Sequence, residues 1–278
     1  MDPARPCENP HLRTVVVPRP RVARSTPNFP CTVVALDGSL KVCAFGYDGP
    51  RPTGTVALLG DSHAENWRAG VQVVAQANHW QALSIALGGC PYSTATRVIP
   101  EPLRSHCMER NQDVPGWFAQ HPEVHTVFVA QISGTPWVIP PGQNQFETQV
   151  SDYIAAWNAL PPSVQHIIVI RDTPKALPTT ARCVDRAIAA NRNAGQVCKM
   201  ARREVLDSDP AVAAAVRLAS PRVQVVNLTR YFCGRRWCYP VVGGALVQKD
   251  WNHVSSVFTG TVGPYLLRHV SGLMASWQ

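Results

Sequence analysis

Short apolar runs alternate with longer stretches of helical periodicity from Thr55 to the end of the chain. The runs have the length of strands buried on both faces, and they predict strands at 56–59 (VALL), 82–87 (ALSIAL), 126–132 (TVFVAQI), 166–171 (HIIVIR) and 223–228 (VQVVNL). The stretches between and after them predict helices at 64–77, 145–160, 198–218 and 254–276. This alternation predicts an α/β fold with a central parallel sheet, arranged as a three-layer α/β/α sandwich.

The first fifty residues have a different character. They are rich in Pro and Arg (VVVPRPRVARSTPNFP) and predict an extended segment, with a short hairpin that pairs 32–36 with 40–44. The 278 residues are enough to bury one large core. We therefore expect an N-terminal extension or linker over 1–50 and one domain over 51–278.

Composition narrows the class of protein. Apolar residues make up 45% of the chain, and Lys and Arg exceed Asp and Glu by eight, without a dense basic run. This balance favours a solvated basic surface over a nucleic-acid groove. The sequence also has no apolar stretch long enough for a membrane span and no apolar core of a signal peptide. We expect this segment neither to span a membrane nor to direct its own export.

Nine cysteines indicate an oxidising compartment. Eight fall into neighbouring pairs: Cys31 with Cys43, Cys90 with Cys107, Cys183 with Cys198, and Cys233 with Cys238. Disulfides between them would close loops of modest length. A zinc site is the alternative, but the chain lacks a C-x-x-C pair and finger-like spacing, and we predict no metal. Cys7 is left over, which implies a free thiol, an intermolecular bond, or a partner outside this segment.

The tetrapeptide Gly60-Asp61-Ser62-His63 lies where the first predicted strand meets a helix. Ser or Asp at such a junction is the expected N-cap. The carboxyl end of a strand in an open α/β sheet is also where ligands bind, and amides at a helix start can stabilise an oxyanion. Ser62 is therefore either a cap or a nucleophile that needs a base from elsewhere in the chain.

A candidate base occurs near the C-terminus in LVQKDWNHVSSVFTG. Asp250 and His253 are three residues apart, a spacing that puts both side chains on one side of a helical turn. A carboxylate beside an imidazole fixes its tautomer and stabilises the imidazolium that forms when it takes a serine proton. The alternative makes Asp250 or Asn252 the N-cap of the last helix and His253 a surface residue.

Together, LLGDSHAENW and KDWNHVSS resemble the serine block and the D-x-x-H block of the SGNH (GDSL-like) hydrolases. The likeness is greatest to the extracytoplasmic SGNH domain fused behind the integral-membrane acyltransferase-three domain of bacterial cell-envelope O-acyltransferases. It extends over KVCAFG, LGGCPYS, VIRDTP and the C-terminal YFCGRRWCYPVVGGALVQKDWNHVSS. The resemblance implies a flavodoxin-like SGNH fold over 51–278.

The resemblance also implies roles by position. Ser62 would be the nucleophile, His253 the general base and then acid, and Asp250 its orienting partner. The oxyanion hole would use the amide of Ser62 and that of Gly88 or Gly89. The asparagine that gives SGNH its N is missing, because the third strand ends in AQISGTPW; Gln131 or Ser133 would then supply a donor, or the hole has two donors.

Three residues are candidates for an acceptor pocket. His63 follows the nucleophile and is assigned no catalytic step, while Asp172 and Thr173, followed by Pro174, lie where the fourth strand opens onto the same edge of the sheet. A plain turn is the equal alternative for 172–174.

Three functions remain open. The first is an acyl-transfer module that receives an acyl group from an upstream integral-membrane domain and passes it, through Ser62, to a carbohydrate hydroxyl of the envelope. The second is a free-standing carbohydrate or small-ester esterase, and the third a glycan-binding module without catalysis. The first implies an extracytoplasmic location, tethering by a preceding membrane domain, no cofactor, no nucleic-acid partner and a monomeric isolated domain. The family resemblance implies that the partner of Cys7 lies just upstream of this segment.

Overall fold

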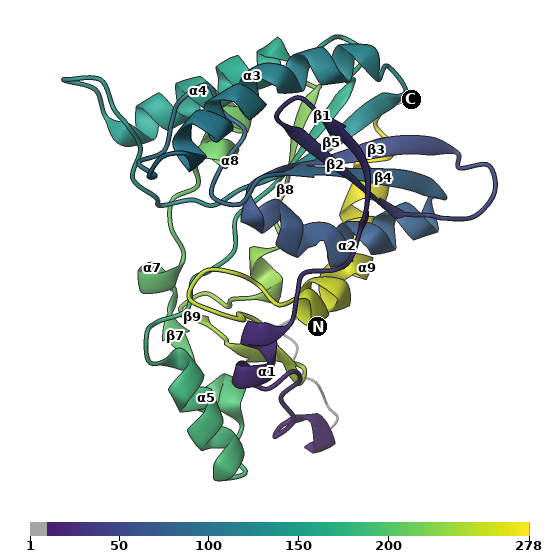
Figure 1. Ribbon diagram of the computed structural model, residues 1–278. Helices are drawn as coiled ribbons and strands as arrows, with labels where there is room; N and C mark the ends of the chain where they lie inside the picture. Colours follow the sequence, from purple (N-terminus) through teal and green to yellow (C-terminus); the bar gives the residue numbers. More distant parts are fainter. Residues whose placement is uncertain (1–9, 278) are drawn as a thin grey trace.

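The computed structural model describes residues 10–277 and is built around one large sheet (Figure 1). Seven strands form this sheet in the order β1-β2-β4-β3-β5-β6-β8. Their bounds are β1 Thr32–Asp37, β2 Leu40–Gly46, β3 Gly54–Gly60, β4 Trp80–Ala86, β5 Val124–Ala130, β6 His166–Ile170 and β8 Val223–Val226. Strands β4, β3, β5, β6 and β8 are parallel, whereas β2 pairs antiparallel with β4, and β1 with β2. The α/β fold with a central, mostly parallel sheet is as predicted.

Helices cover both faces of the sheet, which gives the expected three layers (Figure 1). Helices α2 (Ser62–Ala77) and α9 (Ser256–Met274) pack together on one face. Helices α3 (Leu103–Gln120), α4 (Gln145–Ala159) and α8 (Pro210–Leu218) lie on the other. Alternate strand residues face the two layers, so each face has its own apolar core.

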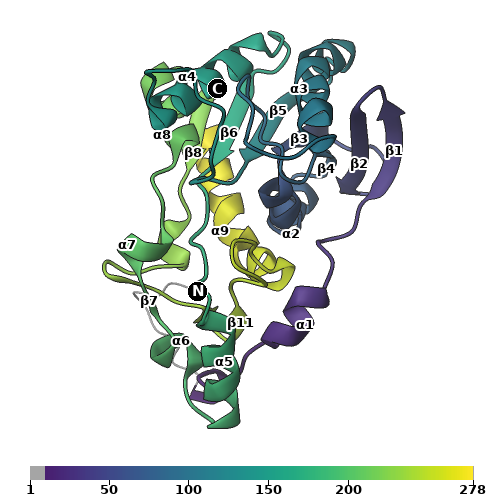
Figure 2. The same cartoon turned by 60° about the vertical axis from the view of Figure 1, so that its left-hand side comes forward.

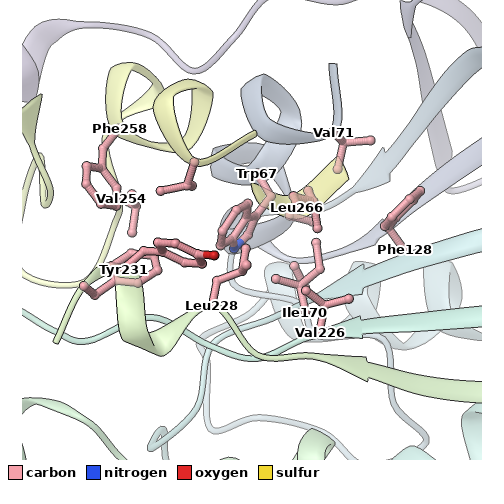
Figure 3. Packing of buried hydrophobic residues seen from close by; sticks show 14 of the residues in the cluster. Trp67, Val71, Phe128, Ile170, Val226, Leu228, Tyr231, Val254, Phe258 and Leu266 are labelled. Carbon is pink, nitrogen blue, oxygen red and sulfur yellow. The ribbon is translucent and has the colours of Figure 1, made fainter. Parts of the chain in front are cut away.

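The core under α2 and α9 lies closest to the catalytic candidates. Trp67 of α2 and Phe258 of α9 are buried in the same apolar cluster as strand residues such as Ile170 (Figure 3). This packing joins the helix that begins at Ser62 to the helix that follows the D-x-x-H segment. The two halves of the candidate site are thus parts of one rigid layer.

A smaller part of the molecule extends away from the sheet (Figure 2). It contains short elements: η1 Pro10–Leu12, α1 Pro20–Ser25, α5 Thr180–Ala189, α6 Ala194–Val197, β7 Met200–Ala201, α7 Arg202–Val205, β9 Trp237–Cys238, β10 Val241–Val242 and β11 Ala245–Leu246. The short helix η2 Thr229–Tyr231 instead packs through Tyr231 into the core under α2 and α9. A separate apolar cluster that includes Ala23, Val184 and Leu246 holds α1, α5 and β11 together.

Four disulfides join the predicted pairs: Cys31–Cys43, Cys90–Cys107, Cys183–Cys198 and Cys233–Cys238. Cys7 lies outside the described residues. In the part of the chain that the structure describes, none of the helices has the length and hydropathy to cross a bilayer.

The structure confirms one of the expected elements, with an added role, and corrects another. The hairpin predicted within 32–44 forms, but it extends the main sheet, so this sheet begins at Thr32. The single helix expected over 198–218 is interrupted, because Met200–Ala201 pairs with β9, the short helix α7 ends at Val205, and α8 starts only at Pro210. Asp209 caps that helix, and proline at its first position removes a backbone donor that a continuous helix would need.

Candidate active site

The turn between β3 and α2 presents Ser62 at the carboxyl end of the sheet. A Cβ on Gly60 would collide with the carbonyl oxygen of Ala130, so only glycine fits there. Asp61, not Ser62, is the N-cap of α2: its Oδ1 accepts from the amide of His63 at 2.8 Å. The other oxygen of Asp61 accepts from the amide of Ile132 at 3.0 Å. The capping role is therefore filled, and the hydroxyl of Ser62 is left for another partner.

The D-x-x-H segment forms a turn before α9 and does not cap it. Ser255 is the N-cap of α9, with its Oγ accepting from the amide of Phe258. The carboxylate of Asp250 instead accepts the amides of Asn252 at 3.0 Å and His253 at 2.8 Å. This wraps the backbone around the carboxylate and directs the imidazole toward α2.

The three side chains form a continuous chain of hydrogen bonds. Nε2 of His253 lies 2.9 Å from Oγ of Ser62, and Nδ1 of His253 lies 2.7 Å from Oδ2 of Asp250. With the proton on Nδ1, the ring donates to Asp250 and its Nε2 accepts from the hydroxyl. Burial raises the pKa of Asp250, but the hydrogen bonds from His253 and from the amide of Asn252 outweigh it and lower that pKa to about 2. Asp250 is therefore a carboxylate at any working pH.

A second histidine–aspartate pair lies beside the first. Nδ1 of His63 is 2.6 Å from Oδ1 of Asp172, and the ring centroids of His63 and His253 are 5.6 Å apart. Oδ2 of Asp172 accepts from both the amide and the hydroxyl of Ser133, each at 2.7 Å, and the amide of Thr173 donates to Oδ1. The pair thus ties the start of α2 to the segments that follow β5 and β6.

Both members of this second pair are charged. Burial alone would lower the pKa of His63, but the carboxylate of Asp172, with Asp61 and Asp250 nearby, raises it to about 9. Burial opposes the ionisation of Asp172, yet His63 and Ser133 lower its pKa. A doubly protonated His63 needs an acceptor at Nε2, which lies 3.4 Å from Nδ2 of Asn252. Turning that amide over pairs the proton with Oδ1 of Asn252, which otherwise has no partner.

Two arginines, one buried and one half-buried, hold the ends of β3 and β4 and the glycine loop that follows β4. Arg110, only 2% exposed, donates to the carbonyls of Gly60 at 3.0 Å and Ile85 at 2.6 Å, while Arg97 donates to the carbonyl of Gly89 at 2.9 Å. A Cβ on Gly88 would meet no atom within 4 Å, so its α-carbon borders open space. These arginines were not singled out by the sequence, because neither lies inside a motif block: Arg97 follows LGGCPYS by four residues, and Arg110 lies further on.

The segment after β5 places the two candidate donors differently. Ser133 gives its hydroxyl to Asp172 and is 5% exposed. Gln131 is 4% exposed; its Oε1 accepts from the amide of Tyr92 at 3.0 Å, and its Nε2 is buried without a partner. Of the two side chains, only Gln131 keeps an uncommitted donor.

The structure brings the predicted residues together in two groups. Ser62, His253 and Asp250 form the partly exposed series of hydrogen bonds, and Gly88 and Gly89 lie on the loop after the neighbouring strand β4. His63, Asp172 and Thr173 are 3%, 8% and 5% exposed and bonded to one another or to neighbouring backbone. Their role as an acceptor pocket remains a prediction, and their contacts are those of an internal brace.

Comparison with known proteins identifies a family and several similar structures. The family model described as "SGNH domain (fused to AT3 domains)" matches residues 30–268. No curated protein matches. Among solved structures, the periplasmic domain of a lipopolysaccharide acetyltransferase from Salmonella ser. Paratyphi A superposes with a TM-score of 0.57 and 12% identity, over 78% of this chain and 85% of that one.

Two carbohydrate esterases of family 2 are also similar. The enzyme from Corynascus thermopiles (Myceliophthora fergusii), which carries a carbohydrate-binding domain, has a TM-score of 0.45 and 14% identity over 82% of this chain and 68% of that one. The enzyme from Cellvibrio japonicus has a TM-score of 0.44 and 12% identity over 83% and 64%. The family match spans most of the chain, so this protein belongs to the SGNH domains of the kind that are fused to AT3, or acyltransferase-three, domains.

Proposed function

We propose that this chain is the extracytoplasmic acyl-transfer module of a cell-envelope O-acyltransferase, with Ser62 carrying the acyl group as an ester. One observation carries the proposal: the unbroken hydrogen-bond chain from Oγ of Ser62 through His253 to Asp250, at 2.9 and 2.7 Å. A nucleophile, a base within reach and a group that orients the base are the parts that acyl transfer needs.

The reaction consists of two displacements. Oγ of Ser62 bonds to the acyl carbon while its proton passes to Nε2 of His253, and the donor's leaving group departs with that proton. The acceptor hydroxyl then gives its proton to Nε2, its oxygen bonds to the acyl carbon, and the bond to Oγ breaks as Oγ takes the proton back. Asp250, ionised throughout, stabilises the imidazolium in both steps.

Donor and acceptor follow from the family rather than from the site. The family description names fusion to AT3 domains, which supports a membrane acyltransferase domain as the acyl donor. The similar acetyltransferase domain is periplasmic and acts on lipopolysaccharide by its name, which supports an envelope carbohydrate as acceptor and an extracytoplasmic location. The four disulfides agree with that location.

Intact-mass spectrometry with 4-nitrophenyl acetate tests the proposal. We expect one acetyl adduct on the wild-type chain and none on Ser62→Ala, while Ser271→Ala, an exposed serine of α9, behaves as wild type. An adduct that persists in water until a polyol is added supports transfer. Rapid loss with steady nitrophenol release would assign an esterase instead. If a folded wild-type chain forms no adduct and releases no nitrophenol, both enzyme hypotheses fail and the glycan-binding module is the hypothesis that remains.

A further inference from the structure

Trp251 lies in the turn that carries two residues of the candidate active site, Asp250 and His253. It lies between Asp250 and Asn252, in the turn whose backbone wraps around the Asp250 carboxylate. Asn252 is 4% exposed and turns inward toward His63, and His253 reaches Ser62. Trp251 is 58% exposed, the largest fraction among the eight tryptophans.

The backbone beneath the indole is fixed. The amide of Lys249 donates to the carbonyl of His253 at 2.8 Å, and the amide of Ala176 donates to the carbonyl of Trp251 at 2.7 Å. The side chain of Gln248 adds a bond to the carbonyl of Pro174 at 3.0 Å. The indole is therefore carried on a braced turn whose position relative to the catalytic histidine is set.

More than half of the surface of Trp251 is open to solvent. Within residues 10–277, the stacked rings and ring–cation contacts involve other tryptophans but not Trp251. The other strongly exposed tryptophan, Trp237 at 39%, has Nζ of Lys199 at 4.9 Å from its ring centroid. A large flat apolar surface left in water on the turn that carries His253 is a surface that a bound ligand would cover.

We propose that Trp251 is the platform on which a pyranose ring of the acceptor carbohydrate stacks; this inference rests on the proposed function. One face of a pyranose presents C–H groups and its rim carries hydroxyls, so a single exposed indole binds the ring while leaving its hydroxyls free. An acyl chain, in contrast, needs an enclosed apolar channel. Trp251 is two residues from His253 in the same turn. A ring stacked on it would place the acceptor near the imidazole that must receive its proton.

Steady-state kinetics with matched esters test the platform. The two substrates are a methyl 6-O-acetyl-glucopyranoside and glycerol monoacetate, which has hydroxyls but no ring. We expect Trp251→Ala to lower kcat/KM for the pyranoside about tenfold, mostly through KM, and to leave the glycerol ester within about twofold. Trp251→Phe should restore most of the loss, and the control Trp237→Ala should match wild type.

A loss that is equal for both esters, or no loss for the pyranoside, would overturn the platform. So would a wild-type chain that is acetylated at Ser62 and cleaves glycerol monoacetate but not the pyranoside. If Ser62 is never acetylated, the proposed function fails, and binding then decides the platform separately. The indole N–H resonance of Trp251 is assigned in the NMR spectrum of Ser62→Ala as the one that disappears in Ser62→Ala/Trp251→Ala. This resonance should shift when methyl glucopyranoside is added to Ser62→Ala. A resonance that does not move rejects the platform.

Discussion

Two histidine–aspartate pairs lie side by side in this protein, and they differ in exposure and in what they reach. The imidazole of His253 is 26% exposed and contacts a serine hydroxyl; that of His63 is 4% exposed and contacts the amide of Asn252. Both rings donate through Nδ1 to a carboxylate at nearly the same distance. The bond to a carboxylate is therefore shared by a catalytic candidate and a brace, and what separates them is whether the second ring nitrogen faces a reactive group.

The comparison also explains how the site is built. Asp172 gathers His63, Ser133 and Thr173, while Asn252 connects His63 to the turn that holds Asp250 and His253. The buried pair His63–Asp172, here called the inner pair, thus holds together the segments that follow β3, β5 and β6. We interpret it as the frame on which the partly exposed pair His253–Asp250, the outer pair, keeps its geometry.

The largest expected effect is on the outer pair. His253→Ala should reduce acetyl-ester turnover about 10⁴-fold, because Ser62 loses its base. The free energy of unfolding should change by less than about 1 kcal/mol, because the ring is partly solvated. Turnover and urea denaturation of the same preparation check both expectations. Turnover that survives within about tenfold would show that another group deprotonates Ser62.

Breaking the inner pair should have the opposite signature. Asp172→Ala leaves a buried imidazolium without its counter-charge, and we expect it to lower the free energy of unfolding by about 3–5 kcal/mol. The double variant His63→Ala/Asp172→Ala should cost less than the sum of the single variants, because the two side chains are directly coupled. Urea denaturation of the three variants gives the coupling energy. A coupling energy near zero would contradict a brace.

The pH dependence of stability sharpens the difference between the pairs. The pKa of His63 is about 9 in the folded chain and about 6.5 unfolded, so the folded state binds its proton more tightly. The stabilisation is fully present below pH 6.5 and is lost as the pH rises through 9. We expect the free energy of unfolding to fall by on the order of 3 kcal/mol over that interval. His63→Gln should remove most of this slope, and His253→Gln should keep it.

The outer half of this comparison is readable from the sequence. Apolar runs of strand length and the G-D-S-H and D-x-x-H motifs predict the sheet and the three residues that meet at its carboxyl edge. Helix α3 was not predicted, because LRSHCMERNQDVPGWFAQ is largely polar and contains Pro115, and only a few of its side chains face the core. Helix α3 is therefore determined by its packing against the rest of its layer and not by its own hydropathy pattern.

The inner half is not readable in the same way. His63 and Asp172 are 109 residues apart, and neither spacing nor hydropathy marks them as partners. Asp61 caps α2 and so leaves the hydroxyl of Ser62 for His253. The sequence does not decide which of the two is the cap, because Ser and Asp are about equally favoured at that position. Long-range polar pairs emerge only when the sheet brings the ends of β3, β5 and β6 to one edge.

The smallest expected effect concerns Ser133, a candidate oxyanion donor in the sequence. Its hydroxyl donates to Asp172, so Ser133→Ala removes one hydrogen bond to a charged group and should cost about 1–3 kcal/mol of stability. Because that hydroxyl belongs to the inner pair, ester turnover should remain within about twofold of wild type. Parallel urea denaturation and turnover measurements separate the two roles. A fall in kcat of about 10²-fold with unchanged stability would instead show that Ser133 is an oxyanion donor that acts with the outer pair.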